Sequence, residues 1–548
     1  MKKIILSLIL FSAMSLPLRS QGSDWELLES CTSIMVGKLA SADGSVITSH
    51  TCDGRYRTWM NIVPAQKHKK GAVAKILQGT LFTQTMDEIE QLQRTGKEYQ
   101  IAPDSALHDF EVALGVKGEI PEAEETFAFL YTAYPCMNEK NLAIGETTIE
   151  GRKELENENG MFYIEELERI ALQRCTTARQ AILLMGKLVK EYGYADTGEC
   201  LTVADKNEVW HFEIFGEGKE KTGGVWAAQR IPDDHVGISA NIPRIGEINL
   251  KDKDNFMASE NVFEVAKRMN LWDGKSTFKF WQAYSGKKPF SMREWFVLSS
   301  VAPSLNLSMQ DDELPFSVKP EKPVSVRDVL QFFRTTYEST EYDMTKNLLT
   351  TRQKPDSEET ETVKSNYANP WFSREMIASI NTIKDSTVVR VRNIAVPQCA
   401  YAHVIQIRNG VPDEIACVAY FANDNPAQSP RLPVYAAILQ TPEPFQISGH
   451  KYFTAESAAW IYRQANKLAT IRWQESRKKL EAQLVHFEDK LFDEQGKIDH
   501  EAIKILNEQG RQAFQEYLAT YLRDFSAETL ATWSKLRDEF WYSFIRGL

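Results

Sequence analysis

Residues 31–53, with the sequence CTSIMVGKLASADGSVITSHTCD, hold the pattern that decides the expected fold. The run from 32 to 39 is rich in apolar and β-branched side chains, and the run from 45 to 51 repeats this pattern. Between them, Asp43-Gly44 is a dipeptide that favours a tight turn. The stretch therefore predicts two antiparallel strands, with a thiol, Cys31, as the first residue.

A two-residue turn at this position would place Cys31 at the open end of the hairpin. Asp53 and Arg55 would then lie near the thiol because of the chain path alone. Whether His50, Cys52 or Asp53 points toward the thiol depends on the register, since a shift of one residue turns every side chain to the opposite face. The sequence leaves this question open.

Residues 1–20 are predicted to be a secretory signal peptide. Lys2 and Lys3 form a basic start, residues 4–16 are almost unbroken apolar, and Ser20 is a small residue suited to cleavage. We therefore expect a periplasmic or secreted protein. No later stretch approaches the roughly 20 apolar residues of a membrane-spanning helix, so no integral membrane segment is expected after signal removal.

Residues 21–30 form a polar, acidic decapeptide that signal peptidase would leave attached, and we interpret it as a propeptide. Its removal between Ser30 and Cys31 would make Cys31 the N-terminal residue. A lipoprotein is the alternative, because residues 28–31 loosely match a lipidation signal, although Glu29 stands where a small residue is needed. An ordinary buried thiol is the second alternative.

Composition limits the functional classes. The 548 residues are 43% hydrophobic and 25% charged, which is typical of a globular protein, and the net charge of -11 argues against nucleic acid as a partner. The nine histidines are scattered without metal-ligand spacing, so neither a metal nor another cofactor is expected. The seven cysteines are an odd number, and a disulfide between Cys399 and Cys417 is one of several conceivable pairings.

Three further motifs follow the first stretch in order. They are MNEKNLA at 137–143, ADKNEVW at 204–210, and WAAQRIPDD at 226–234, which leads to Ala240-Asn241. With Cys-Thr-x-x-x-Val-Gly at residue 31, the chain from 31 to about 440 resembles peptidase family C69. This resemblance implies that the protein is an N-terminal-nucleophile (Ntn) cysteine dipeptidase with an α+β, four-layer αββα fold.

The resemblance also implies roles for individual residues. Cys31 would be the nucleophile, Asp53 would orient its amino group, and Asn138 and Asn241 would stabilise the oxyanion. The alternative for both asparagines is purely structural, as a turn residue for Asn138 and as a partner of the backbone for Asn241.

One position departs from the family pattern. Where relatives carry an arginine three residues before the aspartate, this chain has His50. A guanidinium that contacts the thiol or the substrate would then come from another residue, for which Arg55, Arg244 and Arg293 are candidates. His50, Arg55 and Arg244 are accordingly expected to bind substrate.

The role of Cys31 as an N-terminal nucleophile is also chemically reasonable apart from the family resemblance. A free α-amino group titrates near pH 8, close to a thiol, so one N-terminal cysteine can supply both nucleophile and base. We expect a secreted dipeptidase that acts on short peptides through a thioester. The alternatives are an acyl-amide hydrolase of the bile-salt-hydrolase or penicillin-acylase type, and a catalytically silent exported binding lipoprotein. A homo-oligomer remains open.

The remaining chain predicts alternating layers within a domain at 31–450 and a helical region at 451–548. We expect a helix at 177–193, a polar loop at 350–366, strands at 201–204, 209–214, 225–231, 236–241, 387–392, 402–407 and 415–421, and C-terminal helices at 455–492, 501–525 and 527–547. The C-terminal helices are separated near Gly496, with caps at Asp499 and Ser526.

Overall fold

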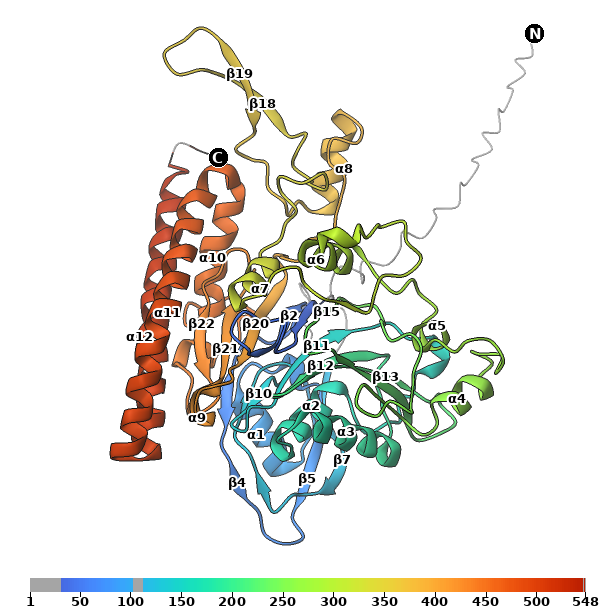
Figure 1. The fold of residues 1–548 in the computed structure, drawn as a ribbon. Coiled ribbons are helices and arrows are strands. Elements are labelled where there is room, and N and C mark those ends of the chain that lie inside the picture. The colour runs from blue at the N-terminus through green and yellow to red at the C-terminus, as the bar shows by residue number, and fades with distance from the viewer. Residues whose placement is uncertain (1–30, 102–111, 546, 548) are drawn as a thin grey trace, which may run out of the picture.

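The computed structural model describes residues 31–101, 112–545 and 547 and contains two large antiparallel sheets with helices around them (Figure 1). The first sheet has seven strands in the order β17-β15-β1-β2-β20-β21-β22. Their bounds are β1 Ser33–Val36, β2 Val46–Asp53, β15 Val236–Ser239, β17 Ser317–Val318, β20 Cys399–Ile407, β21 Cys417–Asn423 and β22 Leu432–Tyr435. The fold is therefore of mixed α and β type, as predicted.

The second sheet has eight strands in the order β16-β14-β13-β12-β11-β10-β9-β3. Their bounds are β3 Asn61–Val63, β9 Phe129–Tyr131, β10 Met137–Asn138, β11 Ala143–Thr148, β12 Glu199–Ala204, β13 Val209–Gly216, β14 Gly224–Ile231 and β16 Phe256–Ala258. The predicted strands at 201–204 and 209–214 are confirmed as the β12–β13 hairpin.

The two sheets meet where β2 lies against β11 and β12. Thr48 Oγ1 donates to the carbonyl of Thr202 at 3.0 Å, and the hydroxyls of Thr147 and Ser239 are 2.5 Å apart. A Cβ atom at Gly145 would lie 2.6 Å from Thr202 Oγ1, so a larger residue does not fit between the sheets. This close approach brings the start of β1, the end of β2 and the end of β11 together.

Helices contact both sheets. α2 (Ile164–Arg174) and α3 (Ala178–Tyr192) contact the eight-stranded sheet, and α6 (Met292–Val301) and α7 (Val326–Phe333) contact the seven-stranded sheet. The start of α3 agrees with the prediction, because the Thr177 side chain accepts from the backbone N–H of Gln180 and caps the helix.

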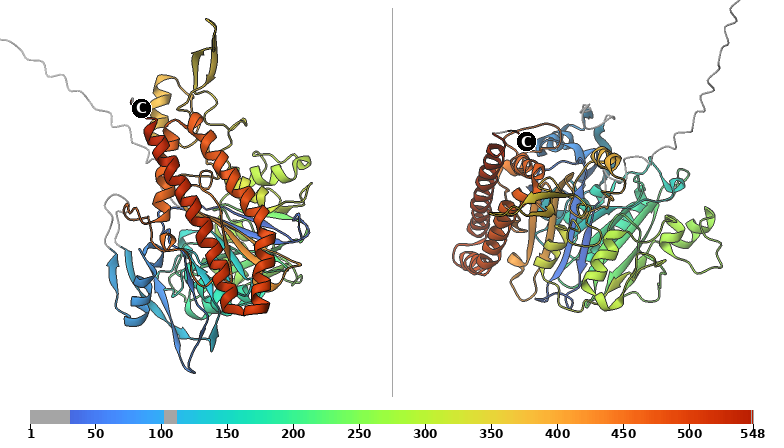
Figure 2. Two further views of the ribbon diagram at one scale, coloured as in Figure 1. Left: turned by 90° about the vertical axis from the view of Figure 1, so that its left-hand side faces the viewer. Right: turned by 90° about the horizontal axis from the view of Figure 1, so that it is seen from above.

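Three C-terminal helices, α10 (Ala458–Ile471), α11 (Trp473–Gln509) and α12 (Arg511–Tyr542), run along the side of the seven-stranded sheet (Figure 2). Their number agrees with the prediction, but their boundaries do not. The predicted break at Gly496 and caps at Asp499 and Ser526 are wrong, because these residues lie within helices. Asp499 accepts from Tyr435 Oη at 2.7 Å and so anchors α11 to the sheet.

The predicted two-residue turn at Asp43-Gly44 is also wrong. β1 pairs with β2 through Val36 and Ile47, and residues 37–45 form a longer connection. Asp43 Oδ1 accepts from the Ser45 backbone, which stabilises a local turn without joining the strands there. Thr32 bridges Thr51, so Cys31 still comes opposite Cys52.

Two other predictions differ from the structure. Residues 350–366 form an exposed hairpin of β18 (Leu349–Gln353) and β19 (Thr360–Lys364) that projects from the body, and residues 387–392 are not a strand (Figure 1). The other strands and α-helices are β4 Gln66–Lys67, β5 Val73–Gln78, β6 Tyr99–Ile101, β7 Val112–Pro121, β8 Glu125–Thr126, α1 Met86–Thr95, α4 Val262–Arg268, α5 Phe280–Tyr284, α8 Arg374–Ile383 and α9 Asp413–Ala416. Among the described residues, none of the helices combines the length and apolar surface that crossing a bilayer requires.

Candidate active site

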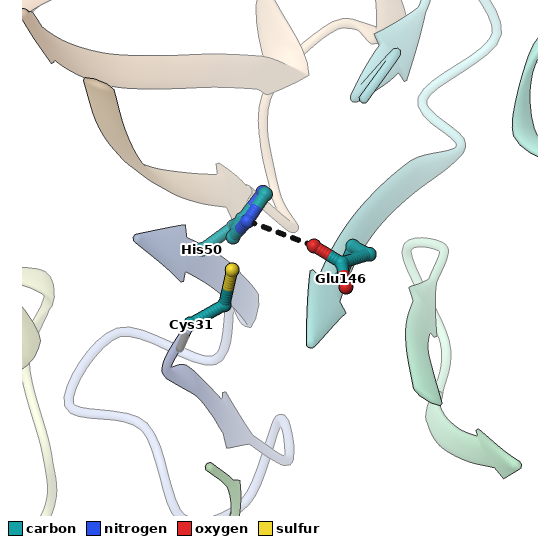
Figure 3. A group of neighbouring side chains, drawn as sticks. All are labelled: Cys31, His50 and Glu146. Carbon is teal, nitrogen blue, oxygen red and sulfur yellow. Dashed lines mark ion pairs between the residues drawn. The ribbon is translucent and has the colours of Figure 1, made fainter. Parts of the chain in front are cut away.

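Cys31 lies two residues before β1, where the two sheets meet, and it is almost completely buried. His50 on β2 and Glu146 on β11 flank it (Figure 3). The thiol sulfur, one ring nitrogen of His50 and one carboxylate oxygen of Glu146 all lie within 4.8 Å of one another. His50 Nε2 is 3.2 Å from Glu146 Oε2.

The pleat of β2 explains why His50 faces this cluster. Alternate residues of a strand share a face, and Thr48, two residues before His50, contacts β12 of the other sheet. His50 therefore also points between the sheets. A register shift between Cys52 and Asp53 interrupts the alternation at the end of the strand.

Asp53 is fully buried next to Cys31. Its Oδ2 accepts from Thr51 Oγ1 at 3.0 Å and from Arg392 Nη2 at 2.9 Å. Burial raises the pKa of the Asp53 carboxyl, and the positive charge of Arg392 counteracts this effect. Arg392 thus stabilises the charged form of a carboxylate that the protein has removed from water.

Burial also raises the pKa of the Cys31 thiol well above its usual value, and the negative charge of Glu146 raises it further. A hydrogen bond from the Asp53 backbone to the sulfur acts in the opposite direction. In this arrangement the thiol carries its proton, so a nearby base is needed before the sulfur becomes a nucleophile.

Arg293 fixes the backbone of the cysteine. Its Nη1 donates to the carbonyl of Cys31 at 2.6 Å and to Thr32 Oγ1 at 3.0 Å. Its Nη2 donates to the carbonyl of Ala240 at 2.8 Å and to Asn241 Oδ1 at 2.9 Å. One buried guanidinium therefore joins β1 to the residues that follow β15.

The start of α6 positions this arginine. Ser291 and Glu294 form a capping box, in which each side chain binds the backbone of the other residue. Arg293 lies in the first turn of the helix that this box begins. Burial lowers the pKa of Arg293 to about 10, and nearby Arg392 contributes to this shift.

The structure brings Asn241 close to Cys31 but not Asn138. One N–H of the Asn241 amide donates to the carbonyl of Thr148 at 2.7 Å, and the other donates to no described residue. Both N–H groups of Asn138 donate to backbone carbonyls, those of Leu172 and Cys175.

Asn138 is also distant along the sheet. Its neighbour Met137 pairs with Ala143, which is three residues and about 10 Å along β11 from Glu146. Asn138 Oδ1 accepts from two backbone N–H groups of the turn that follows it. This geometry corresponds to the turn role that the sequence allowed.

Of the three candidate arginines, Arg293 donates a hydrogen bond to the carbonyl of Cys31. The guanidinium of Arg244 donates to the carbonyls of Pro289 and Pro315. Arg55 is half-buried just after β2. Ser30, the expected residue before the processing site, lies outside the described residues.

Glu146 and Arg392 were not predicted from the sequence as site residues. Glu146 is 115 residues beyond Cys31 and lies in a strand whose pattern gives no sign of catalysis. All seven cysteines are free and buried, so Cys399 and Cys417 form no disulfide. A cavity of about 650 Å³ lies between α3, β14 and β16 and includes none of the site residues.

The chain belongs to peptidase family C69. The sequence model of the family described as "Peptidase family C69" matches residues 30–485, which is most of the chain and includes part of α11. The predicted family is therefore confirmed.

Three relatives align with this chain over most of their own length and most of its length. A probable dipeptidase of Latilactobacillus sakei is 26% identical over 443 residues, which cover 79% of this chain and 80% of the relative. A probable dipeptidase of Salmonella dublin is 27% identical over 418 residues, covering 74% and 80%. Dipeptidase A of Lactobacillus helveticus is 23% identical over 509 residues, covering 89% and 91%.

Proposed function

We propose that the protein is a secreted cysteine dipeptidase whose nucleophile is Cys31, exposed as the N-terminal residue by autocatalytic cleavage after Ser30. The observation that carries the proposal is that the family match begins at residue 30, directly before a cysteine held by Arg293 and Asp53. Relatives named dipeptidase support the substrate class.

We also propose that the two sheets and their helices form the four-layer αββα sandwich of Ntn hydrolases. The contact of β2 with β11, and of separate helix pairs with each sheet, support this assignment. Residues 1–20 would be the signal peptide and 21–30 the propeptide, which gives a periplasmic or secreted enzyme.

In the proposed reaction, the α-amino group of mature Cys31 takes the thiol proton. The thiolate attacks the peptide carbonyl, and the free N–H of Asn241 stabilises the oxyanion, a contribution of roughly 2.7 to 4 kcal/mol for one well-aimed donor. The second amino acid leaves with a proton, and water hydrolyses the thioester. Asp53 orients the amino group, and Arg293 holds the Cys31 carbonyl.

The test combines intact mass spectrometry of the exported protein with a panel of dipeptides and acyl-amides. The proposal expects a chain that begins at Cys31, hydrolysis of dipeptides, and loss of both processing and hydrolysis in Cys31→Ala. Full activity with residues 21–30 retained, a lipid adduct on Cys31, or hydrolysis of acyl-amides alone would contradict it.

A further inference from the structure

The Cys31 cluster contains the three donor types that Zn²⁺ prefers in proteins, a thiol sulfur, an imidazole nitrogen and a carboxylate oxygen. The bond lengths of tetrahedral zinc place its ligand atoms about 3.3 to 3.6 Å apart. His50 Nε2 and Glu146 Oε2 are 3.2 Å apart, and all three donor atoms lie within 4.8 Å of one another. Small side-chain shifts would therefore bring them to ligand distance.

The donor atoms of His50 and Glu146 face each other, with Nε2 and Oε2 in an ion-pair contact (Figure 3). Both ring nitrogens of His50 and Oε2 of Glu146 are buried, and apart from the contact between Nε2 and Oε2 none of the three has a hydrogen bond to a described residue. A buried polar atom without a hydrogen bond destabilises the fold, and a bound ion would satisfy it. The other oxygen of Glu146 accepts from Thr148 Oγ1 at 3.1 Å, which orients the carboxylate toward the cluster.

Charge balance favours a divalent cation at this position. A thiolate and a carboxylate together carry two negative charges, and a buried site tolerates them when a dication neutralises both. We propose that Cys31, His50 and Glu146 bind a divalent transition-metal ion, represented by Zn²⁺, which reversibly blocks the nucleophile. On binding, the metal accepts an electron pair from the sulfur, the thiol proton leaves to solvent, and nothing is oxidised or reduced.

A fourth donor depends on the function proposed above. Cleavage after Ser30 would free the α-amino nitrogen of Cys31, which can chelate the same ion together with the sulfur. The three side-chain donors do not depend on this cleavage.

A second group of the same residue types provides a matched control. Cys200 Sγ lies 3.4 Å from His211 Nε2, which is 2.8 Å from Glu213 Oε1. Unlike Oε2 of Glu146, the Glu213 oxygen that contacts the imidazole also accepts from backbone N–H groups, including that of Ile245 at 3.1 Å. This group is therefore expected to leave metal unbound.

The test is a titration of the metal-free mature protein with Co²⁺, whose thiolate complexes absorb by charge transfer in the near ultraviolet. The proposal expects this band to saturate at one equivalent and to disappear when Zn²⁺ is added. The band should be absent in Cys31→Ser and unchanged in Cys200→Ser. Binding should weaken at least about tenfold in His50→Gln and Glu146→Gln.

The absence of the band, its retention in Cys31→Ser, its loss in Cys200→Ser, or unchanged affinity in folded Glu146→Gln would overturn the proposal. Circular dichroism checks that each variant is folded. If His50→Gln does not fold, the metal affinity of Glu146→Gln decides the test. Zn²⁺ should also inhibit dipeptide hydrolysis, with recovery on adding a chelator. A protein that binds Co²⁺ at Cys31 without hydrolysing dipeptides would refute the dipeptidase function and leave the metal site intact.

Discussion

Arg293→Lys tests how the cysteine is held. The guanidinium makes four hydrogen bonds through two nitrogens, to Cys31, Thr32, Ala240 and Asn241. A lysine ammonium donates from one point and cannot reach both pairs of acceptors, so at least two of the bonds are lost. With about 1.5 to 3 kcal/mol for a hydrogen bond to a charged group, we expect the free energy of unfolding to fall by about 3 kcal/mol.

The effect on catalysis should be separate from the effect on stability. A displacement of about 1 Å of a reacting group can cost 10²-fold in rate, so kcat on dipeptides should fall about 100-fold while KM changes little. Urea unfolding and steady-state kinetics below the unfolding transition measure the two quantities.

Arg169→Lys is the matched control. Arg169 is also buried, and it pairs with Glu166 within α2 through Nε and Nη2, without contact to the site. The Arg169→Lys variant should be less stable than the unsubstituted protein and should keep its kcat. If Arg293→Lys keeps kcat within twofold, or if both variants lose activity equally, the argument for Arg293 as a positioning residue is refuted.

Two further predictions concern stability. Gly145→Ala inserts a methyl group between the sheets, so urea unfolding should show a free energy of unfolding lower by about 1 to 3 kcal/mol. Gly246→Ala is the control and should change this free energy little, because a Cβ atom there would have no atom within 4 Å. Equal effects of the two substitutions would contradict the close approach of the sheets. Burial lowers the pKa of His211, but Cys200 and Glu213 outweigh burial and raise it to about 10. Protonated His211 thus stabilises the fold below its unfolded pKa of about 6.5, and unfolding experiments should show this contribution disappearing as the pH rises toward 10, with no such change in His211→Gln.

The sequence predicted elements whose signal is local. The β12–β13 hairpin follows from period-two alternation, and α3 follows from a capping residue before a helical pattern. The C-terminal boundaries were wrong because Gly496 and Asp499 resemble a helix break in sequence. In the structure, Gly496 continues α11 with open space around it, and Asp499 binds Tyr435 across the interface.

The candidate site was predictable only in part. Cys31 and Asp53 are joined by one hairpin, so a sequence motif brings them together. Glu146 and Arg392 reach the site from distant strands and loops, and no spacing rule connects them to Cys31. Arg293 was one of three candidates until the hydrogen bond to the Cys31 carbonyl distinguished it.

Rapid acid quenching of the mature enzyme mixed with a dipeptide, followed by peptide mass spectrometry, tests the central claim most directly. The account predicts that the peptide containing Cys31 gains the mass of the first aminoacyl group, and that Cys31→Ala forms no adduct and no product. Product formation by Cys31→Ala, or an aminoacyl group on any other residue, would contradict it.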